Sequence, residues 1–168
     1  MDAGCGLGKV TVGVAKLLTE GRVVGIDIWD KLDIKGISPG QAYQNAEIEA
    51  VKNKVEFKTG NVLDIPFLNN SFDVVTAGGL LLSFSSNKKR LKALSEILRV
   101  LKPGGKFLLM EPLRTPLTLI LFPGMAWKFL SRRNCLNLLN RAGFINLKED
   151  YRDIMGYFLA KKPQEKYR

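Results

Sequence analysis

The stretch "MDAGCGLGKV" at residues 1–10 decides the fold of this chain. It contains an aspartate followed by three alternating glycines, in the pattern D-x-G-x-G-x-G. Glycines let a backbone turn sharply and approach a ligand without a Cβ between them. The apolar periodicity of residues 7–20 predicts a helix directly after the loop, so the N–H groups of its first turn would face whatever the loop binds.

That first helix is expected to bury one apolar face and to end at Gly21. The side chains that share the predicted face are Leu7, Val10, Val14, Leu17 and Leu18. Further along, Ser38 and Gln41 are spaced as a capping box, and Asn87 is positioned to cap another helix.

Segments with strand and helix patterns alternate along the rest of the chain. This alternation predicts one α/β domain over residues 1–162, with a mostly parallel sheet and helices on both of its faces. The final two strands are expected to pair antiparallel, and residues 163–168 to form a disordered tail. The predicted strands span residues 22–27, 54–59, 72–77, 106–112, 144–151 and 154–162, the later helices span 38–52, 87–101 and 133–142, and a turn is expected at 102–105.

The spacing of the glycines argues against a dinucleotide or a Walker-type phosphate loop. The dinucleotide pattern G-x-G-x-x-G would need a third glycine at Lys9 or at Thr11, depending on the register. Asp27 ends the strand at 22–27, about 20 residues after the loop, where a carboxylate can accept hydrogen bonds from two ribose hydroxyls. The residues thus favour a nucleoside cofactor with no phosphate to bind.

Four motifs in order extend this interpretation to a family. They are "DAGCGLG" (2–8), "GIDIW" (25–29), "GNVLDIPFLNNSFDVV" (60–75) and "EILRVLKPGGKFLLMEP" (96–112). Together they resemble the class I S-adenosylmethionine-dependent methyltransferases, of the broad methyltransferase type 11 group. The resemblance implies a Rossmann-like, doubly wound sheet, S-adenosylmethionine as cofactor, and methyl transfer to a small-molecule or lipid-like acceptor.

The resemblance also implies roles for the residues of the glycine loop. Asp2 and the backbone from Ala3 through Gly8 would hold the amino-acid part of the cofactor. Within that loop Gly4, Gly6 and Gly8 supply the turns, whereas Cys5 is expected to pack as a small side chain and not to act as a nucleophile.

Further site residues follow from the resemblance at the ends of the later strands. Asp27 would accept the ribose hydroxyls, and Ile28 would pack on the adenine. Asn61 stands where the family usually has an acidic residue that accepts from the adenine amino group, and Val62 would offer its backbone N–H to the ring. The pair that would border the sulfonium and the acceptor is Ala77 and Gly78.

The amino-acid composition limits which catalytic groups, metal ligands and partners are expected. The chain has no histidine, which removes the commonest general base and a favoured metal ligand, so no metal site and no catalytic residue are predicted. Tyr43, Glu111 and Arg114 are conceivable pocket groups only.

The net charge of +10 is spread along the chain and not interleaved with aromatics, so nucleic acid is not an expected partner. Two cysteines and no signal peptide favour a cytoplasmic protein.

Residues 113–130 follow the strand at 106–112 and would overhang the acceptor site. No charge stands between Thr115 and Trp127, and basic residues flank this run. The segment is interpreted as an apolar lid for a hydrophobic acceptor or as a membrane-surface contact. Core or subunit packing is the structural alternative.

Two other functions stay open. A non-catalytic methyltransferase-like fragment with impaired cofactor binding is one, and an NAD(P)-dependent oxidoreductase is the other. Only three residues precede Gly4, although a buried strand needs about five. We therefore expect the first strand to be truncated and its missing part to lie upstream of Met1.

Overall fold

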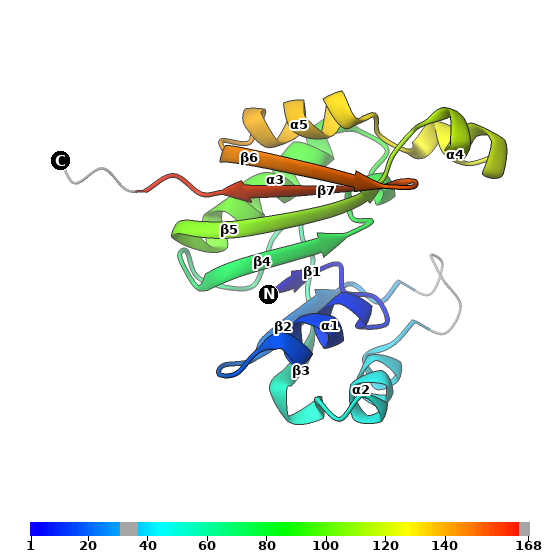
Figure 1. The fold of residues 1–168 in the computed structure, drawn as a ribbon. Helices are drawn as coiled ribbons and strands as arrows, with labels where there is room; N and C mark the ends of the chain where they lie inside the picture. Colours follow the sequence, from blue (N-terminus) through cyan, green and yellow to red (C-terminus); the bar gives the residue numbers. More distant parts are fainter. Residues whose placement is uncertain (31–36, 165–168) are drawn as a thin grey trace.

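A computed structural model describes residues 1–30 and 37–164 of the 168-residue chain. Residues 165–168 of the predicted tail lie outside the described residues. The described part forms a seven-stranded sheet in the order β3-β2-β1-β4-β5-β7-β6 (Figure 1). The strands are β1 (Asp2–Ala3), β2 (Val23–Asp27), β3 (Val55–Thr59), β4 (Phe72–Gly78), β5 (Leu101–Pro112), β6 (Ile145–Arg152) and β7 (Met155–Lys161).

The pairing of the strands confirms the predicted sheet. The short strand β1 lies in the middle of the sheet and pairs parallel with β2 and β4, with Asp2 opposite Gly25 on one side and Thr76 on the other. Strand β3 continues the parallel part, as does β5 next to β4. Strand β7 runs antiparallel to both β5 and β6, which closes the sheet.

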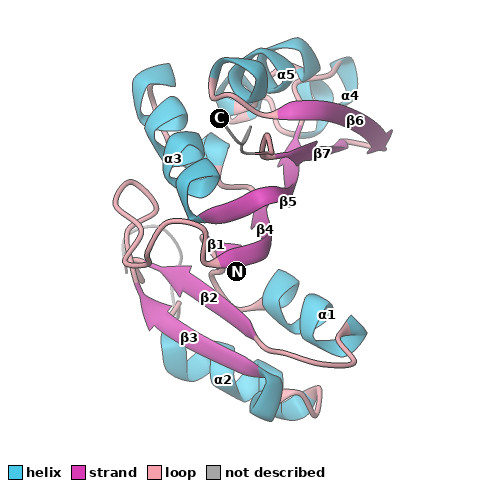
Figure 2. Ribbon diagram, turned by 90° about the vertical axis from the view of Figure 1, so that its left-hand side faces the viewer, coloured by secondary structure: helices cyan, strands magenta, loops and turns pink. Residues whose placement is uncertain are grey.

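Helices cover both faces of the sheet (Figure 2). They are α1 (Lys9–Leu17), α2 (Pro39–Ile48), α3 (Asn87–Val100) and α5 (Arg132–Arg141). Helix α4 (Pro116–Leu121) instead projects beyond the sheet (Figure 1). The short 3₁₀ turns are η1 (Lys52–Lys54), η2 (Leu81–Ser83) and η3 (Ala126–Lys128). None of the described helices has the length and apolarity needed to cross a membrane.

Each face of the sheet has its own hydrophobic core. Val23 of β2 packs with Ala15 of α1 and Ala42 of α2 in one core. Ile26 of the same strand packs in the other core, together with residues of α3 and α5. Successive strand residues point to opposite faces, so a strand with apolar residues on both faces must be covered twice. This confirms the doubly wound fold.

The first helix has a different buried face from the predicted one. It begins at Lys9 and ends at Leu17, and its buried residues are Thr11, Val12 and Ala15. Leu17 is 84% exposed. The physical reason is polar: the Thr11 hydroxyl donates to Asp2 Oδ2 over 2.7 Å, which fixes the rotation of α1 about its axis. Apolar periodicity alone carries no information on that bond.

Two local predictions on either side of α3 are also corrected. Ser86, and not Asn87, caps the helix, because the Ser86 hydroxyl accepts from the Lys89 N–H while Asn87 is the first helical residue. The predicted turn at 102–105 lies inside β5, where the pairing register with β4 shifts. Gly104 takes a φ of 74° there, so the K-P-G-G sequence bends a strand instead of ending one.

Candidate active site

The glycine loop follows β1 and turns tightly under the end of β2. Gly4, Gly6 and Gly8 have φ angles of 72°, 51° and 79°. The N–H groups of Gly4 and Cys5 both donate to Ile26 O, over 2.9 and 3.0 Å, so the loop is tied to β2. Residues with a Cβ rarely adopt these angles, which explains the glycines in physical terms.

Close packing separates the roles of the three glycines. A Cβ on Gly4 would come within 2.9 Å of Leu80 Cδ1, and a Cβ on Gly8 would come within 2.8 Å of the Phe57 ring. A Cβ on Gly6 would meet nothing within 4 Å. Gly4 and Gly8 therefore serve the fold, whereas Gly6 faces open space.

Cys5 packs as predicted in the core under α1 and α2. A Cβ on Gly25 would approach its Sγ to 2.9 Å, so sulfur and glycine fit each other. Burial raises the pKa of the Cys5 thiol far above its ordinary value, and the nearby Asp2 and Asp27 raise it further. Such a thiol stays protonated and is a poor nucleophile.

Asp27 ends β2 with both carboxylate oxygens held by backbone. Its Oδ2 accepts from the Gly6 N–H and its Oδ1 from the Trp29 N–H, each over 2.9 Å. Every carboxylate oxygen can accept a second hydrogen bond, so both oxygens retain an acceptor position for a ligand. Asp27 is thus oriented before any ligand binds.

Asp2 is buried between α1 and β4. Its two oxygens accept from the hydroxyls of Thr11, over 2.7 Å, and Thr76, over 2.9 Å. Burial raises the pKa of Asp2, and the two threonine hydrogen bonds oppose that shift. No role was predicted for Thr11 or Thr76, although the hydroxyl that follows two valines in "FDVVTA", within a predicted buried strand, was a usable signal.

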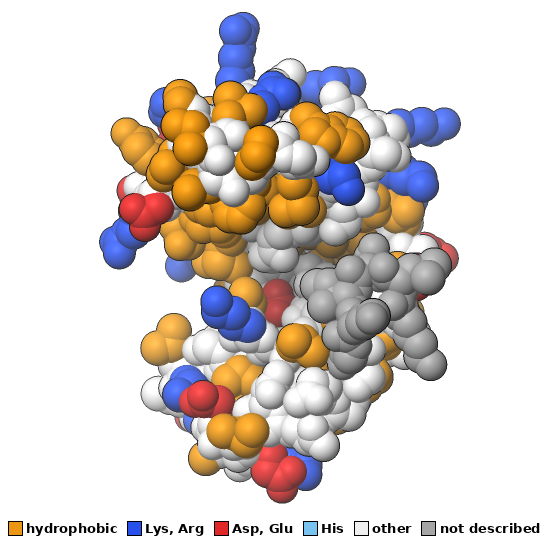
Figure 3. All heavy atoms as spheres, turned by 90° about the vertical axis from the view of Figure 1, so that its right-hand side faces the viewer, with side chains coloured by type: hydrophobic (Ala, Val, Ile, Leu, Met, Phe, Trp, Pro, Cys, Tyr) orange, Lys and Arg blue, Asp and Glu red, His pale blue; other side chains and the backbone are white. Residues whose placement is uncertain are grey.

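These groups open onto a cavity of about 1320 Å³ at the carboxyl ends of the parallel strands. Figure 3 looks onto this end of the molecule, where the surface is hollowed. A doubly wound sheet binds ligands at this edge, where the strand order reverses on either side of β1. The predicted site residues in the cavity lining are Asp2, Gly4, Cys5, Gly6, Asp27 and Gly78.

The other predicted site residues lie outside the cavity lining. Ala3 and Ala77 are fully buried in the sheet, and Gly8 caps α1. Ile28 is exposed next to Asp27, and its contact with the adenine stays a prediction. Residues that the sequence did not single out as ligands also line the cavity, among them Asp30, Lys9, Arg90 and Met110.

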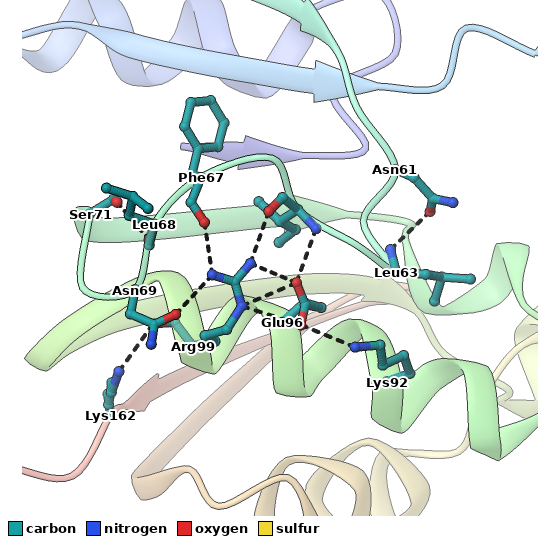
Figure 4. Close-up of polar contacts among 11 residues, drawn as sticks. Asn61, Leu63, Phe67, Leu68, Asn69, Ser71, Lys92, Glu96, Arg99 and Lys162 are labelled. Atoms are coloured by element: carbon teal, nitrogen blue, oxygen red, sulfur yellow. Dashed lines mark hydrogen bonds and ion pairs between the residues drawn. The ribbon is translucent and has the colours of Figure 1, made fainter.

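Asn61 and Val62 stand in the connection between β3 and β4. The Asn61 side chain is exposed, and its Oδ1 accepts from the Leu63 N–H over 2.9 Å (Figure 4). The resemblance implies that this same oxygen accepts a hydrogen bond from the adenine amino group. It would then accept from two donors, the Leu63 N–H and the adenine amino group. Val62 is buried in the core that contains α3. The role of both residues at the cofactor stays a prediction.

The three conceivable pocket groups, Tyr43, Glu111 and Arg114, lie in different surroundings. Tyr43 packs on Phe57 and its hydroxyl accepts from the Phe57 N–H over 3.1 Å, which is a structural role. Arg114 lines the cavity. Glu111 is buried beneath the loop after β4, where its Oε1 accepts from the Leu81 N–H over 2.6 Å. That loop contains Gly79, a cavity-lining residue, so Glu111 holds a loop of the cavity wall.

The raised pKa of Glu111 should make the free energy of unfolding depend on pH. Burial raises its pKa from 4.5 to about 7, against the lowering effect of the backbone N–H groups of residues 80–82 and of Arg90. Between these two values the folded state holds a proton that the unfolded state has lost. The free energy of unfolding therefore falls as pH rises from about 4.5 to 7, by about 3 kcal/mol for this group.

The measurement is urea unfolding at pH 5 and at pH 8 for the wild type and for Glu111→Gln. The amide of the variant has no proton to lose, so the wild type should lose about 2–3 kcal/mol more than the variant between the two pH values. The same pH dependence in both proteins would refute a titrating Glu111.

The cavity offers the groups that the expected cofactor needs. The ribose of the cofactor needs a pair of hydrogen-bond acceptors, which the two oxygens of Asp27 can supply. The amino-acid part of the cofactor needs room and polar groups. The open space at Gly6 gives room, and Asp2 gives a carboxylate beside it. The described residues contain no cluster of His, Cys, Asp or Glu that could hold a metal ion. These carboxylate acceptors and the open space at Gly6 fit S-adenosylmethionine.

Comparison with known proteins gives the same assignment. A family described as "Methyltransferase domain" matches residues 1–109. The demethylmenaquinone methyltransferase of Symbiobacterium thermophilum is 34% identical over 112 residues, which are 66% of this chain and 41% of that protein. The enzyme of the same name from Lactiplantibacillus plantarum is also 34% identical over 112 residues, 66% of this chain and 44% of that protein. The matched stretch thus spans less than half of these curated relatives.

Solved structures extend the likeness over the whole chain. A SAM-dependent methyltransferase from Methanosarcina mazei has a TM-score of 0.70 and 25% identity, over 98% of this chain and 92% of that one. Human N-acetylserotonin methyltransferase has the same fold, with a TM-score of 0.73 and 21% identity over 97% of this chain and 47% of that one. The fold, the glycine loop with its strand-end aspartate, and the family match agree, and the chain belongs to the methyltransferase domain family, with the class I fold that its sequence resembles.

Proposed function

We propose that this chain binds S-adenosylmethionine at the carboxyl ends of β1, β2 and β4 and transfers its methyl group to an apolar small molecule. One observation carries the proposal: Asp27, with each oxygen already oriented by one backbone N–H, stands at the cavity beside the open face of Gly6. The family match and the relatives named as methyltransferases support it. A cytoplasmic location is part of the same proposal.

The cofactor supplies an activated methyl group on a sulfonium, and the protein supplies position and a dry site. Asp27 would bind the ribose hydroxyls, and Asp2 with the loop N–H groups would bind the amino-acid part. Gly78 and Gly79 would line the reacting centre, where Gly79 is fixed by donating its N–H to Met110 O over 2.8 Å. No described residue is assigned as a base, because in-line methyl transfer needs one only for an acceptor that must lose a proton early.

The class of acceptor follows from the far side of the cavity. Apolar side chains from β5, β7 and the 113–130 segment line it: Met110, Pro112, Met125, Phe129, Leu130 and Met155. Polar groups also line this side of the cavity, among them Arg114, Lys128 and Tyr157. A largely apolar wall with a few polar groups binds an apolar molecule and orients it by its polar contacts. Demethylmenaquinone methyltransferases among the relatives are compatible with an apolar acceptor for this chain, which we propose as its substrate class.

A calorimetric titration tests the cofactor. S-adenosylhomocysteine should bind with a Kd in the micromolar range and raise the melting temperature, whereas NAD and NADP should give no heat. Binding of NAD(P) alone would instead indicate an oxidoreductase. No heat from any of these ligands, with a folded protein, would support the non-catalytic alternative and overturn the proposal.

A further inference from the structure

Residues 113–130 form a compact projection after β5, closed at its base. Leu113 and Leu130 pair as an isolated bridge, and the Arg114 N–H donates to Leu130 O over 2.9 Å. Inside the projection, the Thr118 hydroxyl donates to Leu113 O over 3.0 Å. Leu113 and Leu130 anchor the projection, because both belong to the core that contains α3 and α5. The other buried residues of the projection are Thr118, Ala126 and Phe129.

The remaining apolar side chains of the projection point outward. The exposed set is Leu117, Leu119, Ile120, Leu121, Phe122, Met125 and Trp127. Ile120 is 76% exposed and Trp127 is 69% exposed. Exposed apolar residues scattered singly are ordinary, but a set concentrated in one short segment indicates a surface that is covered in use. We call this set the apolar tip.

The apolar tip divides into two parts by its relation to the cavity. Met125 and Trp127 also line the cavity and stand at its mouth. The exposed leucines and isoleucine of α4 are not among the lining residues. An acceptor in the cavity would therefore cover Met125 and Trp127 and leave α4 in water, so another partner must cover α4.

The charges around the tip identify that partner. No acidic residue stands between Glu111 and Glu149 in the sequence, whereas Arg114, Lys128 and Arg133 are exposed in this stretch. One exposed acidic residue, Asp153, lies near the base of the projection, where the Leu113 N–H donates to Ile154 O over 2.7 Å. Arg132 is already paired with Glu149, over 2.7 Å from Nε to Oε2. Figure 3 shows hydrophobic side chains gathered on the upper part of this face, with Lys and Arg side chains around them.

We propose that the apolar tip docks the protein onto an anionic phospholipid bilayer. Leucine, isoleucine and tryptophan side chains with a rim of Lys and Arg are the composition that lies in the interface of such a membrane. Lys128 also lies 5.5 Å above the Trp127 ring, which brings a cation and an interfacial aromatic together. A second copy of the chain fits less well, because an isologous contact through this face would bring the two cationic rims together.

Docking would place the cavity mouth against the bilayer, since Trp127 belongs to both surfaces. An apolar acceptor could then enter from the lipid without crossing water. This last step rests on the proposed function, whereas docking itself does not. The two proposals therefore fail separately: one by the loss of cofactor binding in solution, the other by the absence of vesicle binding.

The test is co-sedimentation of the full chain with vesicles of phosphatidylcholine, with and without phosphatidylserine, at low and high salt. We expect binding to the vesicles that contain phosphatidylserine, weaker binding at high salt, and a blue shift of tryptophan emission. The double variant Ile120→Ser/Trp127→Ser should bind at least about tenfold more weakly.

A matched control is Leu17→Ser/Ile48→Ser. These side chains on α1 and α2 are 84% and 79% exposed, and neither belongs to the apolar tip. This variant should bind vesicles like the wild type. The proposal is overturned if both double variants bind equally, if no vesicle binds at low salt, or if the tip instead supports a concentration-dependent dimer that the Ile120→Ser/Trp127→Ser change abolishes.

Discussion

Replacement of Asp27 with alanine is expected to weaken the binding of S-adenosylhomocysteine by about 100-fold or more. Each hydrogen bond from a ribose hydroxyl to a carboxylate contributes about 1.5–3 kcal/mol, and the side chain would accept two. The loss of about 3 kcal/mol corresponds to about 100-fold in Kd. Asp27→Ala also removes the acceptors of the Gly6 and Trp29 N–H groups, so the loop loses part of its order.

Two further variants test whether the effect of Asp27→Ala comes from the lost ribose hydrogen bonds. Asp27→Asn keeps one acceptor oxygen but turns an NH₂ group toward the N–H of Gly6 or Trp29, so we expect intermediate affinity. Asp73→Asn changes an exposed carboxylate at the start of β4, which pairs with Lys102 over 2.8 Å. It should bind as the wild type does. Titration calorimetry of folded Asp27→Ala with unchanged affinity would show that Asp27 is only a cap for the loop.

The fold and half of the site could be predicted because their signals are local. The glycine loop, Asp27 and the alternating apolar segments are each contained in a few consecutive residues. The alternation of strand and helix segments predicts a mostly parallel sheet with helices on both faces. The antiparallel pairing of the last two strands was predicted from such segments and is confirmed.

The missed features depend on residues far apart in the chain. Thr76 meets Asp2 only because β4 pairs with β1, and this contact decides how Asp2 is held. The rotation of α1 follows from the same cluster through Thr11. The predicted apolar face was wrong because a buried hydrogen bond, and not apolar periodicity, orients this helix.

Apolar periodicity also gave no sign of a second cluster, in which polar side chains of α3 contact a distant part of the chain. On α3, Glu96 is buried and Arg99 partly so, and they hold the connection between β3 and β4 (Figure 4). Arg99 donates from Nη1 to Phe67 O over 2.8 Å and from Nη2 to Ile65 O over 2.9 Å. The Glu96 carboxylate accepts from Arg99 over 2.7 Å and from the Ile65 N–H over 3.0 Å. In sequence both residues look like ordinary surface charges of a helix.

Arg99→Met is expected to lower the free energy of unfolding by about 3 kcal/mol and the melting temperature by about 10 °C. The variant leaves the Ile65 and Phe67 carbonyls without their donor and leaves Glu96 buried with Lys92 as its remaining cation. Lys102→Met is the control, because it breaks an exposed pair with Asp73 and should cost less than about 0.5 kcal/mol.

Acid titration separates the charge of Glu96 from the packing of Arg99. The pKa of Glu96 is lowered from 4.5 to about 2, chiefly by the hydrogen bonds from Arg99 and in smaller part by those from the Ile65 N–H and Lys92, against the effect of burial. A lowered pKa stabilises the fold above about pH 4.5, and this stability is lost as pH falls through 2. In Arg99→Met the pKa of Glu96 should rise, so unfolding between pH 5 and 3 should become less pH-dependent than in the wild type. The double variant Glu96→Gln/Arg99→Met removes the buried charge that Arg99 no longer balances and should recover part of the lost stability. Strictly additive single-variant effects would show that the two side chains act independently, against the joint role that their geometry indicates.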